Sequence, residues 1–178
     1  EKSVFLLDGG TGEELFHRGV PDDRKIWSAT AVVKSQYHET LKQVHQDFLK
    51  AGSQAITTNS YGIVPGVGFE QDQIIEYVAK AGELARQSVS DSRSNAAVFV
   101  LGSLGPLVES YRPDLIMSRE EGVPIYEKMV RALEPFVDCY LAETMSCVDE
   151  SLQAVEAVGS IKPLLVSFTL DSDGNLRD

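Results

Sequence analysis

The sequence predicts an α/β fold, in which short buried strands alternate with longer amphipathic helices. Three observations point to it. Short apolar runs recur along the 178-residue chain, and each is followed by a polar or glycine-rich segment. Stretches with apolar residues at helical spacing separate these runs. The runs are nearly continuous rather than alternating, which is typical of parallel strands buried on both faces.

Five segments have the features of strands. They are Val4–Asp8, Ala55–Asn59, Val98–Gly102, Cys139–Glu143 and Leu164–Phe168. Each of the four stretches between them carries an apolar stripe that we expect to pack against the sheet. The stripes are Tyr37, Leu41, Val44 and Phe48, then Ile74, Ile75, Val78, Ala81, Leu84 and Ala85, then Ile125, Met129, Leu133 and Phe136, and finally Val148, Leu152, Val155 and Val158.

Two residues mark the expected ends of these helices. Gly52 follows the first stripe, where glycine commonly stops a helix. Pro124 precedes the third stripe, and we expect it in the first turn of that helix, where a missing N–H is tolerated.

Two folds fit this order of elements. A doubly wound sheet of five strands fits 178 residues, whereas a (β/α)₈ barrel needs eight strands and roughly 250 residues. Every predicted strand, however, ends in polar or glycine residues. A barrel brings all strand ends to one site, whereas a doubly wound sheet uses only the strands beside its switch point. This distribution favours the barrel, and the doubly wound sheet is the alternative.

The charge excludes some classes of partner. Lys and Arg number 16 against 27 Asp and Glu, for a net charge of −11, which argues against nucleic acid and membrane surfaces. No stretch approaches ~18 consecutive apolar residues, so we expect no membrane-spanning helix. The cysteines, Cys139 and Cys147, match no common zinc pattern and suit a reducing, cytoplasmic setting.

The densest functional signal is the run Asp8-Gly9-Gly10-Thr11-Gly12. Successive glycines let a ligand approach the backbone, and their N–H groups can bind an anion. Two chemistries fit this loop. One is phosphate binding, as in the glycine loops of some ATPases. The other is capture of an amino-acid carboxylate by the amides, with Asp8 holding the ammonium group.

A second signal is Glu143, which ends an apolar strand where an unpaired carboxylate is costly. No basic residue lies near it in sequence. Asp8 and Glu143 together can flank one cation, which suits a zwitterionic amino acid. Further hydrogen-bonding groups are expected at the same rim, and they are Asn59, Ser60, Tyr61 and Ser103.

These segments together resemble the homocysteine S-methyltransferase family, which includes the betaine-dependent and S-methylmethionine-dependent enzymes. They occur in family order along the whole chain. The matching segments are Leu7–Leu15, Trp27–Ala29, Ala51–Gly52, Ile56–Tyr61, Gly102–Pro106, Tyr111–Asp114, Glu143–Met145 and Val166–Gly174.

The resemblance implies a (β/α)₈ barrel that transfers a methyl group to the thiol of L-homocysteine and forms methionine. It implies that Asp8 and Glu143 hold the amino group of the substrate, and that Gly9 and Gly10 bind its carboxylate. The other substrate-binding candidates are Thr11, Asn59, Ser60 and Ser103, and Tyr61 is the candidate on the methyl-donor side. An aromatic face suits an onium donor.

The resemblance also implies zinc bound by three cysteines, none of which lies within residues 1–178. We therefore expect no metal ligand and no catalytic residue in this chain, which supplies the amino-acid-binding half. We expect residues 1–178 to be the N-terminal part of a single barrel domain, truncated after the fifth strand, and to be inactive alone.

Two other functions fit the sequence. One is a nucleotide- or phosphate-binding α/β enzyme that uses the Gly9-Gly10 loop. The other is a catalytically inactive short form that acts as a binding module. The methyl donor stays open among betaine, S-methylmethionine, S-adenosylmethionine and a folate, and the oligomeric state is open as well.

Overall fold

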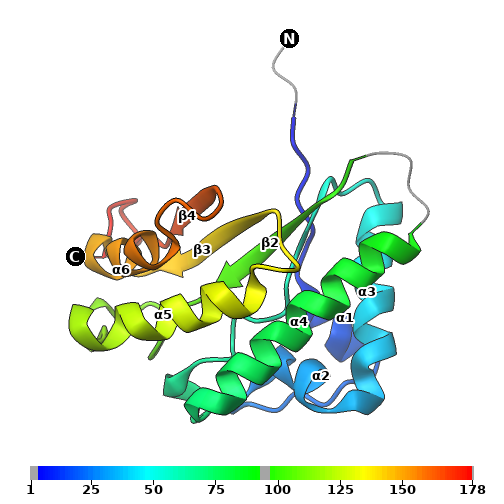
Figure 1. Cartoon of the computed structure of the whole chain (residues 1–178), viewed down its shortest axis with the longest axis horizontal. Coiled ribbons are helices and arrows are strands. Elements are labelled where there is room, and N and C mark those ends of the chain that lie inside the picture. Colours follow the sequence, from blue (N-terminus) through cyan, green and yellow to red (C-terminus); the bar gives the residue numbers. More distant parts are fainter. Residues whose placement is uncertain (1–3, 93–96, 178) are drawn as a thin grey trace.

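The computed structural model of the chain describes residues 4–92 and 97–177. In these residues, four parallel strands form one sheet in consecutive order (Figure 1). The strands are β1 (Ala55–Thr57), β2 (Phe99–Leu104), β3 (Cys139–Met145) and β4 (Leu164–Phe168). Helices connect each strand to the next, so the α/β prediction is confirmed.

Six α-helices and four short 3₁₀ turns accompany the described sheet. The helices are α1 (Thr11–His17), α2 (Thr30–Val33), α3 (His38–Lys50), α4 (Gln71–Asp91), α5 (Arg119–Leu133) and α6 (Val148–Val158). The turns are η1 (Trp27–Ala29), η2 (Ser35–Tyr37), η3 (Pro65–Val67) and η4 (Pro113–Leu115). Pro124 lies inside α5 rather than in its first turn, because the helix already begins at Arg119.

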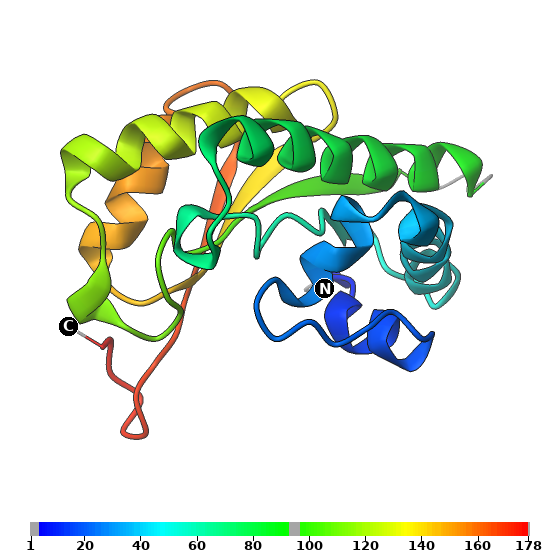
Figure 2. The ribbon, with the colours of Figure 1, turned by 90° about the horizontal axis from the view of Figure 1, so that it is seen from below.

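The strand order separates the two competing folds. A doubly wound sheet reverses its order at a switch point, with helices on both faces. Here β1, β2, β3 and β4 follow one another without a reversal, as successive strands of a barrel do. Helices α4 and α5 lie side by side along one face of this sheet (Figure 2).

The first predicted strand is wrong as an element. Residues 4–10 are extended but form no strand. The Gln54 backbone N–H donates to the Leu6 carbonyl oxygen at 2.8 Å. The Leu6 N–H donates instead to the Gln54 side-chain oxygen, at 3.0 Å. The segment thus runs beside β1 with a glutamine side chain in place of the second backbone partner, which leaves the ladder incomplete.

The first three predicted helical stripes form the core between helices and sheet. Leu41 and Val44 on α3, Val78 on α4 and Met129 on α5 are fully buried. The hydroxyl of Tyr140 on β3 donates to the Val130 carbonyl oxygen of α5 at 2.8 Å, which ties the sheet to that helix. These stripes confirm the expected packing of the helices on the sheet.

The fourth stripe is wrong for three of its four members. On α6, Val148, Leu152 and Val155 are 40%, 49% and 41% exposed, and only Val158 is buried. The reason is that α6 contacts α5 and β3 through its other side. Strand β4 and residues 4–7 also expose apolar side chains, because neither is covered on its outer side by another described element.

Candidate functional site

A cavity of about 440 Å³ lies where residues 7–12 meet the carboxyl ends of β1 and β3. We call it the carboxylate cavity. It is lined by Leu7, Asp8, Gly9, Gly10, Thr11, Gly12, Ser28, Thr57, Thr58, Asn59, Tyr61, Tyr111, Leu141, Glu143 and Thr144. Parallel strands present their carboxyl ends at one edge, so residues far apart in sequence converge there.

Asp8 is fixed in this cavity by β1. Its carboxylate accepts hydrogen bonds from the Thr57 backbone N–H at 2.7 Å and from the Thr57 hydroxyl at 2.8 Å. Burial raises the pKa of Asp8, and the two hydrogen bonds from Thr57 oppose that rise. The aspartate side chain therefore joins the extended segment to the sheet in place of strand hydrogen bonds.

Glu143 enters the same cavity from the end of β3. Its Oε1 accepts a hydrogen bond from the Ser103 hydroxyl of β2 at 2.5 Å. Burial raises the pKa of Glu143, the Ser103 hydrogen bond opposes the rise, and the negative charge of Asp8 adds to it. The negative charges of Asp8 and Glu143 thus repel each other across the cavity.

The charge balance of the cavity is one-sided. Two carboxylates line it, and none of the described lining residues is Lys, Arg or His. Two partly desolvated anions without a cation are unfavourable, and a bound cation between them removes that cost. The cavity is therefore suited to a ligand with a positive group.

The glycine loop, which also lines this cavity, offers backbone N–H groups that suit a negatively charged group. Gly10 precedes α1, and its carbonyl accepts the Glu14 N–H at 3.1 Å. Within the described ranges, the Gly9 and Gly10 N–H groups donate to no other residue. A Cβ on Gly9 would lie 2.8 Å from Cε1 of Phe48 on α3, so a side chain there would require the Phe48 ring to shift. The backbone amides remain available to an anionic group.

Three predicted site residues serve mainly to hold the walls together. Asn59 lines the cavity, but its amide donates to the Ser28 carbonyl at 2.7 Å. Ser60 and Ser103 are fully buried and do not line the cavity. The Ser60 hydroxyl donates to the Ser103 carbonyl at 2.8 Å, and Ser103 reaches the site through Glu143.

An aromatic group closes another side of the cavity. The Tyr61 hydroxyl lies 2.6 Å from the Ser110 hydroxyl, across the loops that follow β1 and β2. Tyr111 also lines the cavity, and the Arg177 guanidinium carbon stands 5.4 Å from the centre of its ring. This wall is apolar in its ring faces and polar in its hydroxyls.

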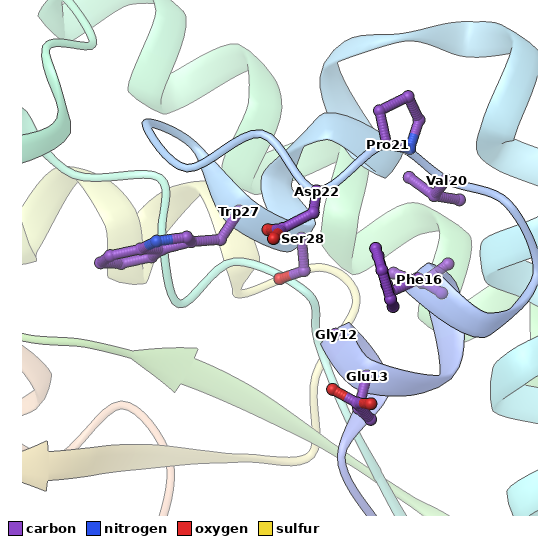
Figure 3. A pocket seen from close by; sticks show the side chains of 9 residues that line it. Gly12, Glu13, Phe16, Val20, Pro21, Asp22, Trp27 and Ser28 are labelled. Atoms are coloured by element: carbon purple, nitrogen blue, oxygen red, sulfur yellow. The ribbon is translucent and has the colours of Figure 1, made fainter.

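A second, smaller cavity of about 240 Å³ adjoins the first and shares Gly12 and Ser28 with it. Figure 3 shows it between α1 and the segment that carries Val20 to Ser28. Glu13 and Asp22 give it an acidic lining, and Trp27 extends from its edge. The acidic character of the site thus continues beyond the carboxylate cavity.

Residues with a strained backbone conformation line the two cavities. Among the described residues, three non-glycine residues have a left-handed φ, namely Trp27 (45°), Tyr111 (66°) and Thr144 (63°). All three line one of the two cavities. Such residues cost roughly 1–3 kcal/mol each and persist where the surroundings enforce them, commonly at functional sites.

The described residues do not fit a metal. They contain no group of three or more His, Cys, Asp or Glu side chains that would hold one. Cys147 is buried and Cys139 is half-buried on β3. None of the helices in residues 4–92 and 97–177 has the length and apolar character needed to cross a membrane.

Sequence reasoning missed several residues that shape the site. Thr57 holds Asp8, yet a threonine inside a strand carries no signal for that contact. Tyr111 and Thr144 were part of recognisable segments, but their place in the cavity depends on unusual backbone angles. Only the folded geometry reveals these contributions.

The fold is shared with a known enzyme. The homocysteine methyltransferase MmuM from Escherichia coli, in its metallated form, superposes with a TM-score of 0.86 at 28% sequence identity. The match covers 100% of this chain and 67% of that chain. It confirms that the chain is part of a (β/α)₈ barrel, as predicted, and not a doubly wound sheet.

Sequence comparisons agree with the structural one. The homocysteine S-methyltransferase of Escherichia coli K12 is 28% identical over 196 residues, covering 100% of this chain and 62% of that relative. Bacillus subtilis homocysteine S-methyltransferase YbgG is 27% identical over 167 residues, covering 83% of this chain and 52% of that relative. The profile described as homocysteine S-methyltransferase matches residues 5–178, nearly the whole length, so the chain belongs to the homocysteine S-methyltransferase family.

Proposed function

We propose that the protein transfers a methyl group to the thiol of L-homocysteine, and that this chain binds the amino-acid half of the substrate. The observation that carries the proposal is the pair of cavity carboxylates without a cation, set beside free backbone amides. The names of the E. coli and B. subtilis relatives support the same reaction.

In this proposal each charged group of homocysteine has its own partner. The ammonium group lies between Asp8 and Glu143, which ionise fully when it binds because its charge offsets their burial. The carboxylate accepts hydrogen bonds from the Gly9 and Gly10 amides, beside Thr11. A phosphate ligand is disfavoured, because the same two carboxylates would repel it.

Holding the ammonium and carboxylate groups fixes the α-carbon of homocysteine and so limits where its sulfur can lie. The thiol releases its proton to solvent, the sulfur forms a bond to the methyl carbon, and the bond from that carbon to the donor breaks with its electron pair left on the donor. A fixed geometry for this in-line displacement contributes much of the rate. In this proposal Tyr61 faces the methyl donor, because an aromatic face attracts a positively charged group.

If zinc activates the thiol, its ligands must come from residues outside this chain. The described residues do not fit a zinc site, so the ligands would be the three cysteines that the family resemblance places elsewhere. We propose that residues 1–178 are the N-terminal part of one barrel domain, since the chain spans 62% of the length of the E. coli relative.

The test is calorimetric titration of the full-length protein with L-homocysteine. Glu143→Ala should lower the affinity by roughly a hundredfold, since losing one partner of a buried ion pair costs about 3 kcal/mol. Glu76→Gln, on the exposed side of α4, is the control and should leave the affinity unchanged.

Two further ligands sharpen this experiment. N-acetylhomocysteine, which lacks the ammonium group, should not bind the wild-type protein. ATP should not raise its Tm, whereas L-homocysteine should. Unchanged homocysteine affinity in Glu143→Ala would refute the assigned role, and stabilisation by ATP alone would favour a nucleotide-binding function.

A further inference from the structure

The end of β3 contains an extra residue relative to its neighbour β4. Ala142 pairs with Val166 and Met145 pairs with Phe168. Two residues of β3, Glu143 and Thr144, therefore stand opposite one residue of β4. This is a β-bulge, an irregularity that commonly redirects a side chain near an active site.

The bulge changes which side chains enter the carboxylate cavity. In a regular strand, successive side chains point to opposite faces. Tyr140, Ala142 and Met145 are all fully buried in the core. Glu143 and Thr144, although adjacent, both line the cavity. Without the extra residue, one of these two side chains would face the core instead.

The conformation of Thr144 makes the bulge costly. Its φ of 63° is left-handed, and for a β-branched residue that value is a true outlier. Glycine would adopt it freely, as in the common bulge type that has a left-handed glycine. A threonine at this position therefore keeps its side chain at the expense of backbone strain.

The side chain that is kept lies in the same cavity as Tyr61. Burial raises the pKa of Tyr61, and hydrogen bonding to the side chains of Ser110 and Thr144 opposes that rise. The Tyr61 hydroxyl also lies 2.6 Å from the Ser110 hydroxyl. The Tyr61 hydroxyl thus has its partner Ser110 in the loop that follows β2, and Thr144 at the end of β3 lines the same cavity as Tyr61.

The residues that follow the bulge are held by the carboxylate of Glu150. Glu150 of α6 is only 4% exposed, and it accepts the Ser146 backbone N–H at 2.7 Å. Burial raises the pKa of Glu150, and its hydrogen bonds to Ser146 oppose that rise. Thr144 therefore lies between the β3–β4 pairing before it and the hydrogen bond between Ser146 and Glu150 after it.

We propose that Thr144 is a positioning residue: its left-handed bulge turns Glu143 and its own side chain into the carboxylate cavity, where its hydroxyl holds Tyr61. This role rests on the proposed function, in which Glu143 binds the substrate ammonium group and Tyr61 faces the methyl donor. Thr144 touches neither reacting atom and acts through these two residues.

Three variants of the full-length protein separate the backbone from the hydroxyl. Thr144→Val keeps the branched shape and removes the hydroxyl. Thr144→Ser keeps the hydroxyl. Thr144→Gly relieves the left-handed strain and removes the side chain. For each, we would measure Tm, the Kd of L-homocysteine, and kcat with S-methylmethionine or betaine as the donor probe.

The expected pattern differs from that of a merely structural residue. Thr144→Val should lower kcat about tenfold, the worth of one hydrogen bond, while the homocysteine Kd changes less than about threefold because the bulge persists. Thr144→Ser should retain kcat within about twofold. Thr144→Gly should lose turnover while its Tm stays within a few degrees of the wild-type value, because relief of the backbone strain offsets the lost hydrogen bond and the added chain entropy.

A measurement without substrate keeps this test independent of the proposed function. With ¹³C-labelled tyrosine, the Tyr61 ring signal should shift in Thr144→Val and stay in place in Thr144→Ser. Wild-type turnover in Thr144→Val or in Thr144→Gly, or an unmoved Tyr61 signal in Thr144→Val, would each overturn the role of Thr144. Failure of the wild-type protein to bind homocysteine would instead refute the proposed function.

Discussion

At the scale of single residues, the site depends on carboxylates whose ionisation is controlled by their neighbours. Glu143 is partly buried near the negative charge of Asp8, and both the burial and that charge raise its pKa and favour its neutral form. The Ser103 hydroxyl favours the ionised form by hydrogen bonding to it. A fully buried serine that does not line the carboxylate cavity thereby favours the ionised form of a glutamate that does.

Ser103→Ala should therefore change the pH dependence of homocysteine binding. Without the hydrogen bond, the pKa of Glu143 rises further. Because the ammonium group needs an ionised partner, affinity should fall at a higher pH than in the wild-type protein. Calorimetric Kd values measured across the acid range would show the fall in affinity shifted to higher pH in the variant. A superimposable profile would mean that Ser103 does not control Glu143.

His45 makes stability depend on pH. The ring is fully buried in α3, and among the described residues neither ring nitrogen has a hydrogen-bond partner. Burial lowers its pKa to about 4. The unfolded state takes up the proton near pH 6.5 and the folded state only near 4. Stability is therefore full above pH 6.5 and falls by about 3 kcal/mol towards pH 4.

His45→Leu should remove that part of the acid sensitivity. Urea unfolding at pH 7 and at pH 4.5 would show a smaller loss of stability in the variant than in the wild-type protein. His17→Gln is the control, because His17 is exposed on α1. Equal losses in His45→Leu and the wild-type protein would contradict a neutral buried histidine.

At the scale of elements, a few side chains join the helices to the sheet where backbone ladders do not. Asp138 precedes β3 and accepts the Val100 N–H of β2 at 2.7 Å and the Arg86 guanidinium of α4 at 2.8 Å. Arg86 also donates to the Phe136 carbonyl at 2.8 Å. These contacts set how α4 lies against two neighbouring strands.

Asp138→Ala should destabilise the protein by about 1–3 kcal/mol, because it removes the acceptor of the Val100 N–H and of one of the two hydrogen bonds that the Arg86 guanidinium donates. The matched control is Asp114→Ala, since Asp114 and Arg112 form an exposed pair at 2.7 Å. Exposed pairs contribute little, so its Tm should not change. Thermal unfolding of the two variants makes the comparison, and equal Tm losses would contradict it.

At the scale of the whole molecule, the apolar surface is unevenly distributed. The first extended segment and β4 bound the described sheet, and both expose large apolar side chains, including Phe5, Leu165 and Val166. An exposed apolar edge strand pairs readily with another chain. We propose that further polypeptide of the barrel covers these edges in the active protein.

A polypeptide of residues 1–178 alone should therefore self-associate and lack methyltransferase activity. Val166→Lys should reduce the association, because a charge on an edge strand opposes strand pairing. Val148→Lys is the control, since Val148 is 40% exposed and Val166 38%, but Val148 lies on a helix. Size-exclusion chromatography with light scattering would compare them. Equal effects would indicate general apolar association instead.

Local pattern was sufficient for much of the architecture. The β2, β3 and β4 segments and the first three helical stripes were predictable, because burial between helices and a parallel sheet imposes its own periodicity. It failed for Val4–Asp8, where strand character depends on a partner that completes the ladder. It failed for α6 as well, whose apolar stripe faces away from the described core.

The sequence by itself determined the class of the protein: an acidic α/β chain with Asp8, a glycine loop and Glu143 in family order. Those features are local, so they can be recognised without a fold. The tertiary structure alone decided how they are arranged. It brought Thr57 to Asp8 and Ser103 to Glu143, and it placed Thr144 beside Glu143 in one cavity. These contacts join distant segments or depend on one left-handed residue, and no local pattern encodes either.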